Sequence, residues 1–254
     1  MALYLRLSPT DICAADYQAG QPDTLQFRRI RMNPQASFQA NLKEVNLNRD
    51  QQVEVILTDP VTPVPLSEFQ EEDCETLYNY CFIKEGRRKI FYETVPACNI
   101  VLLFALDQAT CKTIQAQFPS AHFTTALQPL LQHFTTQALA TTHHRRTFLH
   151  HHDAQLDIAV FEEKRLILLN SYNVQSLSDV AYYTFNIAQI TGLDLKEDPF
   201  FVTANEQLRQ PIIDNLQAFA KKVYPINPQA EFNRHPVAST PDMPYDLIVR
   251  LART

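Results

Sequence analysis

The sequence predicts an α/β protein with mixed sheets, built from two halves that repeat one order of elements. Three short strand-like segments lie between residues 3 and 32, and three more lie between residues 147 and 174. In each half, the strand triplet precedes a helix, a strand, a second helix and a last strand, as apolar residues at strand or helix spacing indicate. The 45% hydrophobic content is sufficient for one large core or two medium ones.

In the first half, Ser37 and Ser67 are expected to cap helices, because a serine side chain accepts a hydrogen bond from a free N–H of the first turn. The proline run at 60–65 is expected to end a strand, since proline cannot pair in a central strand. An inserted strand–strand–helix subdomain is expected from residue 88 onward. The expected elements are strands at 3–8, 11–17, 24–32, 53–59, 88–96, 99–107 and 121–125, and helices from Ser37, from Ser67 to Phe82, from Gln108 to Phe118, and through Leu127 to Leu139.

The second half is expected to begin at residue 142, because the composition shifts at 142–146 and the strand pattern then starts again. We therefore predict domains at 1–141 and 142–254, the second with a proline-rich tail that forms an irregular wrap closed by the apolar segment 245–251. The expected elements are strands at 147–153, 155–163, 165–174, 200–205 and 223–227, a helix from Ser176 or Ser178 to Gly192, and a helix from Asn205 to Lys222.

Glycine is scarce in this chain. It occurs only at Gly20, Gly86 and Gly192, where ordinary usage of about 7% would give roughly eighteen. Loops that wrap a phosphate need glycine, because the backbone must approach the ligand without a Cβ in the way. The shortage argues against a dinucleotide fingerprint, a phosphate loop, a nucleophile elbow and a kinase flap.

Charge and cysteine usage restrict the partners. The net charge of −6 argues against a nucleic-acid partner, and the basic clusters are short enough to be solvated strand ends or turns. No apolar run approaches the length of a membrane span, and the opening residues lack the pattern of a signal peptide. The five cysteines form no CxxC pair, which favours reduced, buried thiols. A cytoplasmic protein without membrane insertion is the expectation.

The repeated order of elements resembles the duplicated ribonuclease-H-like domain of the actin, sugar-kinase and heat-shock-chaperone superfamily. The extra strand pair resembles the inserted subdomain of actin-like scaffold proteins in pilus assembly and type II secretion. More narrowly, the chain is similar to a bacterial family of unknown function with an actin-like ATPase fold, and the landmarks of that resemblance are LYLRLS (3–8), ILTDPVTPVPLSEF (56–69) and YDLIVRL (245–251). The resemblance spans nearly the whole chain and implies two ribonuclease-H-like halves.

Active members of that superfamily hold ATP with two D-x-G hairpins and a glycine-rich adenosine loop, and the resemblance implies that all three nucleotide motifs are degenerate here. The first hairpin has Thr10 at its tip and no glycine. The second supplies Asp153 and Asp157 but has Ala154 where close backbone approach is needed. The segment VTANEQLRQ (202–210) also lacks glycine. Thr10, Asp153 and Asp157 are therefore the candidate ligand-binding residues of the cleft that the resemblance implies, and no cofactor is expected.

One dense group of potential metal ligands consists of His143, His144, His150, His151, His152 and Asp153. His150 and His152 share a face if they lie on a strand, and two imidazoles with the Asp153 carboxylate have the donor types that zinc or iron takes. A hydrophilic strand that faces the cleft or solvent is the alternative. No catalytic residue is assigned, because no serine, threonine or cysteine stands in a recognisable nucleophile context.

Two function classes follow from these observations. The first is a non-catalytic scaffold or protein-interaction module, a pseudo-ATPase that binds a protein partner, with a homodimer as an open possibility. The second is an enzyme or sensor that binds a nucleotide or metal in the cleft through atypical contacts. Loss of the glycine motifs favours the first class, and occupancy by ATP or metal would favour the second.

Overall fold

The computed structural model describes residues 2–45, 52–82, 86–139, 144–233 and 235–253, and the chain divides into two units. Unit 1 consists of Met1–Pro129 and His235–Thr254, and unit 2 consists of Leu130–Arg234. The expected division at residues 141 and 142 lies outside the described residues. The C-terminal segment differs from the expectation, because it belongs to unit 1 and not to the second half.

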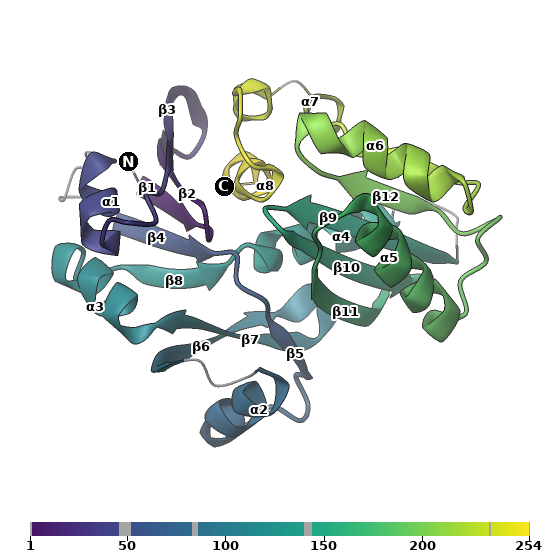
Figure 1. Cartoon of the computed structure of the whole chain (residues 1–254), viewed down its shortest axis with the longest axis horizontal. Coiled ribbons are helices and arrows are strands. Elements are labelled where there is room, and N and C mark those ends of the chain that lie inside the picture. Colours follow the sequence, from purple (N-terminus) through teal and green to yellow (C-terminus); the bar gives the residue numbers. More distant parts are fainter. Residues whose placement is uncertain (1, 46–51, 83–85, 140–143, 234, 254) are drawn as a thin grey trace. The chain divides into compact units, whose positions relative to one another are not determined.

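Unit 1 contains a five-stranded sheet in the order β3-β2-β1-β4-β8 (Figure 1). The first three strands are antiparallel neighbours, and β4 and β8 continue the sheet in parallel. Helices α1 and α3 contact each other beside this sheet. The bounds are β1 Ala2–Leu7, β2 Asp11–Gln18, β3 Gln21–Arg31, β4 Gln52–Leu57, β8 His122–Thr125, α1 Phe38–Glu44 and α3 Gln108–Gln117.

Unit 2 repeats this arrangement in the order β11-β10-β9-β12-β13, with the same directions. The repeat confirms the predicted α/β class with mixed sheets and the duplicated order of strands. The bounds are β9 Arg145–His152, β10 Gln155–Glu162, β11 Arg165–Asn173, β12 Phe200–Thr203, β13 Val223–Pro225, α4 Leu127–Leu139, α5 Leu177–Thr191 and α6 Glu206–Gln217.

Helices cover both faces of the unit 2 sheet. Leu149 on β9 belongs to an apolar cluster with residues of α5 and α6, such as Ile187 and Ile213. Its neighbour Phe148 points to the opposite face, because successive strand residues alternate, and its ring stacks on Phe134 of α4 with centroids 4.3 Å apart. Residues of β9 with even numbers therefore lie on the α4 face, and this alternation places the candidate site.

An insert between β4 and β8 forms a three-stranded sheet, in which the proline-containing β5 pairs as an edge strand. Helix α2 covers one face of it. The helix expected from Ser67 begins only at Cys74, because the N–H groups of Leu66 and Glu68 bond to Asn99 and Pro65 and hold this segment in a turn. The bounds are β5 Thr62–Pro65, α2 Cys74–Cys81, β6 Arg88–Val95 and β7 Ile100–Asp107.

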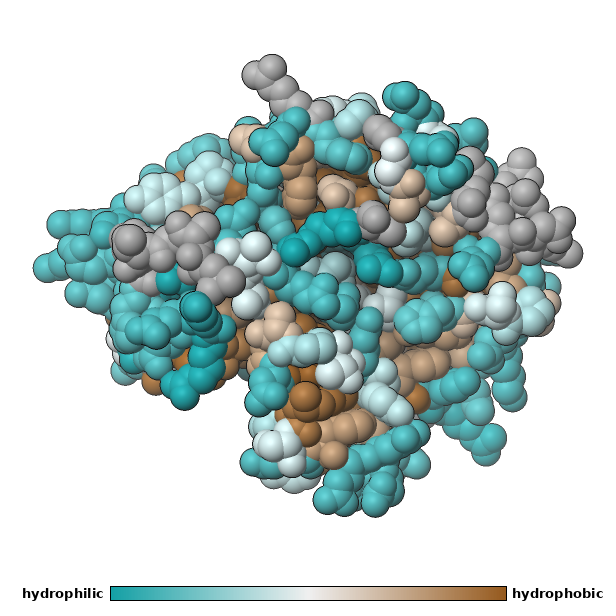
Figure 2. Space-filling view, turned by 180° about the vertical axis from the view of Figure 1, so that it is seen from behind, coloured by the Kyte–Doolittle hydropathy of each residue, from teal (hydrophilic) through white to brown (hydrophobic). Residues whose placement is uncertain are grey.

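The insert also presents apolar side chains at the surface. Figure 2 shows them gathered near the bottom of the view, over the insert. Tyr80 on α2 is 91% exposed, and Leu66 and Tyr92 are also exposed. The ring of Phe69 packs against Tyr92, with centroids 5.1 Å apart. This group of residues, Leu66, Phe69, Tyr80 and Tyr92, is called the insert surface below.

Helix α7 (Pro228–Glu231) belongs to unit 2, and the C-terminal segment of unit 1 contains helix α8 (Tyr245–Ala252). The segment 245–251, expected to close an irregular wrap, is helical, and α8 lies near β1 and β2 in Figure 1. Asp246 on α8 pairs with Arg6 on β1, and Arg250 pairs with Glu54 on β4. These two ion pairs join α8 to the sheet of unit 1. Among the helices of the described residues, none has the length and apolar character that a membrane crossing requires.

Candidate functional site

Four polar side chains cross the unit 2 sheet in one row on the α4 face. His150 on β9 lies opposite Thr203 on β12 and opposite Asp157 on β10, and Asp157 lies opposite Ser171 on β11. His150, Asp157 and Thr203 are each at most 3% exposed. Since polar groups are costly to bury without partners, this row is expected to be hydrogen-bonded throughout.

The contacts follow this row. Nδ1 of His150 lies 2.6 Å from Oγ1 of Thr203, whose hydroxyl lies 3.4 Å from the Leu149 carbonyl oxygen. Oγ of Ser171 donates to Oδ1 of Asp157 at 2.6 Å. The side chains of His150 and Asp157 are thus each held by a hydroxyl group from a neighbouring strand.

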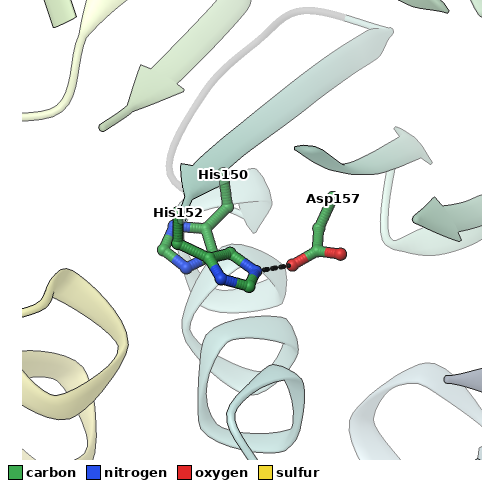
Figure 3. Close-up of side chains that lie close together, drawn as sticks. All are labelled: His150, His152 and Asp157. Atoms are coloured by element: carbon green, nitrogen blue, oxygen red, sulfur yellow. Dashed lines mark hydrogen bonds and ion pairs between the residues drawn. The ribbon is translucent and has the colours of Figure 1, made fainter. Parts of the chain in front are cut away.

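His152 extends the row at the end of β9. Its ring stacks on that of His150, with centroids 4.8 Å apart and an interplanar angle of 28°. Nε2 of His152 lies 2.8 Å from Oδ2 of Asp157, and Nδ1 lies 3.3 Å from Oδ2 of Asp153. Figure 3 shows the two rings side by side and Asp157 directed at His152. His152 therefore stands between two carboxylates.

Electrostatics at Asp157 favour the carboxylate form. Burial opposes ionisation, but the charge and hydrogen bond of His152, with His150 and Ser171, hold the pKa of Asp157 below its usual value. Gln155 adds a hydrogen bond from Nε2 to Oδ1 at 2.8 Å. On the other face of β9, burial, with His152 and His150 nearby, lowers the pKa of His151 to about 4.

The structure brings together three of the second-half residues that the sequence singled out. One ligand atom from each of His150, His152 and Asp157 lies within 4.8 Å of the others. Asp153, the carboxylate expected beside the two histidines, instead lies on the far nitrogen of His152. Ser171 and Thr203 were not predicted, although the strand pairing of the triplet would have placed Ser171 opposite Asp157.

In the first hairpin, the backbone N–H groups donate hydrogen bonds within the hairpin itself. The N–H groups of Thr10 and Asp11 both donate to Oγ of Ser8, at 3.4 and 3.1 Å, and the N–H of Ser8 donates to the Asp11 carbonyl. Pro9 has no N–H. Thr10 itself is exposed and donates from Oγ1 to the Asp11 carboxylate at 2.7 Å. Thr10 lies in unit 1, whereas Asp153 and Asp157 lie in unit 2.

In the segment 202–210, which the resemblance places at the adenosine loop, backbone N–H groups are likewise bonded within the segment. Asn205 caps α6, and its Oδ1 accepts from the N–H of Leu208 at 2.9 Å. The second hairpin turns at Asp153, which takes a left-handed φ of +49° where glycine is the usual residue. A carboxylate thus replaces glycine at the tip of this turn.

Comparison with solved structures identifies the fold. A Bacteroides thetaiotaomicron protein described as having an actin-like ATPase fold and unknown function is 22% identical, with a TM-score of 0.79 over 94% of this chain and 95% of that chain. The PilM–PilN type IV pilus biogenesis complex contains a chain that is 12% identical, with a TM-score of 0.61 over 99% of this chain and 97% of that one. The protein therefore has an actin-like ATPase fold, as its duplicated strand order predicts.

Comparison with protein families gives the closer assignment. No curated protein matches the sequence significantly. The family described as "Protein of unknown function (DUF3822)" matches residues 23–223, a range that begins after β1 and β2 and contains the His150, Asp157, Ser171 and Thr203 row of unit 2. Because this match spans most of the chain, the protein belongs to the DUF3822 family.

Proposed function

We propose that this protein is a non-catalytic member of the actin-like fold that acts as a protein-interaction module. The observation that carries the proposal is the first hairpin, where Ser8 accepts the backbone N–H groups of Thr10 and Asp11. A triphosphate needs such N–H groups as donors. Because they are used inside the hairpin, ATP would have to break them before it could bind.

The other two segments support the same conclusion. At the second hairpin, Asp153 and Asp157 present carboxylates, which repel a polyphosphate unless a cation intervenes. At the start of α6, Asn205 already accepts from Leu208. The net charge of −6 provides no long-range attraction for an anion.

Two further observations favour a protein partner. The insert surface exposes two tyrosines and a leucine, and aromatic side chains are enriched in protein interfaces. The chain matched at a TM-score of 0.61 belongs to the PilM–PilN type IV pilus biogenesis complex, so a chain of this fold can serve in an assembly. We place the partner contact of this protein on the insert surface.

Calorimetry with Mg-ATP tests the non-catalytic part. We expect binding weaker than about 1 mM, which corresponds to about 4 kcal/mol. Micromolar binding that is lost in Thr10→Ala or Asp153→Asn would contradict the proposal and favour a nucleotide-binding enzyme or sensor.

Site-specific photo-crosslinking in the native cell tests the interaction part. A photoreactive residue at Tyr80 is expected to capture one defined protein, and Tyr92→Asp is expected to abolish that capture. A photoreactive residue at exposed Gln35, in the turn before α1, is the matched control. Equal capture at the two positions, or capture that survives Tyr92→Asp, would refute this placement.

A further inference from the structure

We propose that His150, His152 and Asp157 bind a single divalent transition-metal ion, Zn²⁺ in the first instance, on the β9–β10 hairpin. This goes beyond the interaction role and does not depend on it. The three side chains come from two paired strands, and one ligand atom of each lies within 4.8 Å of the others. Ligands bound to one zinc ion lie about 2.0–2.2 Å from it, so atoms this close together can share one ion after side-chain rotation and supply three of its four ligands.

The atoms that would not bind the ion are held by neighbouring groups. Oδ1 of Asp157 accepts from Ser171 at 2.6 Å and from Gln155 at 2.8 Å, which leaves Oδ2 directed at His152. A carboxylate that is fixed through one oxygen presents the other in a defined direction. This is the arrangement expected of a monodentate ligand.

The two imidazoles are oriented in the same way. Asp153 lies on Nδ1 of His152, and Thr203 lies on Nδ1 of His150. Metal-binding histidines almost always donate the other ring N–H to a carboxylate, carbonyl or hydroxyl partner, which fixes the tautomer and the ring plane. Both rings therefore direct Nε2 to the ion, and Asp153 acts as a positioning residue and not as a ligand.

The donor set selects the class of ion. Imidazole nitrogens suit Zn²⁺, Co²⁺, Ni²⁺ and Cu²⁺, whereas Mg²⁺ and Ca²⁺ take oxygen ligands. An ion pair between His152 and Asp157 is the alternative explanation of the short contact. It does not account for the second imidazole, His150, which is buried and whose ring stacks on that of His152 with centroids 4.8 Å apart. The metal site accounts for all three side chains.

The strand offers a matched control. His151 lies between the two proposed ligands, is buried, and points to the opposite face of the sheet because strand residues alternate. His151→Gln therefore removes an imidazole of the same strand without removing a ligand. His150→Gln, His152→Gln and Asp157→Asn each remove one ligand.

The test is titration of the untagged full chain, freed of metal by a chelator, with ZnCl₂ in a calorimeter and with CoCl₂ by visible absorption. We expect one ion per chain with a micromolar or tighter Kd, and Co²⁺ bands in the visible range. Each ligand variant is expected to weaken binding by about a hundredfold or more, and Asp153→Asn by about tenfold, while His151→Gln stays within about twofold of the parent. Circular dichroism confirms that each compared variant is folded.

Two results would overturn the proposal. One is an unaltered chain that binds neither ion more tightly than about 1 mM. The other is binding that is equal in His151→Gln and in the ligand variants, which would place the ion elsewhere. If a ligand variant does not fold, Asp153→Asn and Thr203→Val are measured in its place. Parent-like Zn²⁺ affinity in both of these variants would also reject the site.

Discussion

The Nε atom of Arg6 on β1 donates to both carboxylate oxygens of Asp246 on α8, at 2.8 and 2.9 Å. The side chains are 2% and 0% exposed, so the pair is fully removed from water. A second pair, Arg250 with Glu54, joins the same helix to β4 and is more exposed, at 33% and 16%. Strand β1 thus holds the helix that ends the fold, across 240 positions of sequence.

Asp246→Asn is expected to lower the free energy of unfolding by about 3–5 kcal/mol, because it leaves the buried Arg6 charge without the opposite charge that offsets its desolvation. Glu54→Gln is the control, with an expected loss of about 1 kcal/mol or less, since its partner Arg250 stays in contact with water. Urea unfolding monitored by circular dichroism gives both values. Equal losses in the two variants would show that burial of the pair does not set its contribution.

Ser8→Ala is expected to lower the free energy of unfolding by about 1 kcal/mol, the usual effect of removing a side chain that accepts backbone N–H groups. Ser8 accepts from Thr10 and Asp11. Ser67→Ala, at an exposed turn position, is the control and should change stability by about 0.5 kcal/mol or less. Thermal and urea unfolding give the measurement. An Ser8→Ala chain as stable as the Ser67→Ala chain would contradict the role of the Ser8 hydroxyl.

The parts of the fold that depend on neighbouring residues were predictable from sequence. Ser37 and Ser176 cap helices as expected, and Gly192 takes the left-handed conformation at the end of α5. The start of α2 was not predictable, because it depends on a bond from Leu66 to Asn99, which is distant in sequence. The placement of α8 in unit 1 was not predictable either, because it depends on the pairing of Asp246 with Arg6, which is distant in sequence.

The candidate site, too, was predictable only where it depends on residues that are close in sequence. Alternation along a strand was enough to place His150 and His152 on one face. The third member of the cluster depends on which residue of β10 lies opposite them, so Asp157 and not Asp153 completes it. Thr203 comes from β12, whose parallel pairing with β9 leaves no local signal in the sequence.

Ser176→Ala is expected to destabilise the protein by about 1 kcal/mol, since it removes one half of a capping box. Oγ of Ser176 accepts from the N–H of Asp179 at 3.2 Å, and the Asp179 carboxylate accepts from the N–H of Ser176 at 3.0 Å. Ser178→Ala, the other serine that the sequence offered as a cap, is the control and should have an effect below about 0.5 kcal/mol. The reverse order of the two effects in urea unfolding would assign the cap to Ser178.

Glu93→Gln is expected to become more stable relative to the parent chain as pH rises. Oε2 of Glu93 on β6 accepts from Oγ1 of Thr124 at 2.6 Å and from the N–H of Thr125 at 3.2 Å, which joins the insert to β8. Burial raises the pKa of Glu93, and the nearby Glu54 adds to this, while Thr124, Thr125 and His122 oppose it. The folded chain therefore holds this proton more tightly than the unfolded chain does.

The sign follows from proton linkage. Where the folded state binds more protons than the unfolded state, stability falls as pH rises. The contribution of Glu93 to the free energy of unfolding therefore falls as pH rises from the ordinary glutamate pKa of 4.5 through the raised pKa of the folded state. Glu93→Gln cannot lose a proton, and its stability relative to the parent should increase across that window and then level off. Thr124→Val is the opposite control, because it removes a hydrogen bond that favours the carboxylate and should steepen the fall. Urea unfolding from about pH 4 to pH 8 measures both differences. A Glu93→Gln difference that stays constant would show that folding does not change the pKa of Glu93, and one that decreases with pH would show that the buried contact with β8 favours the carboxylate.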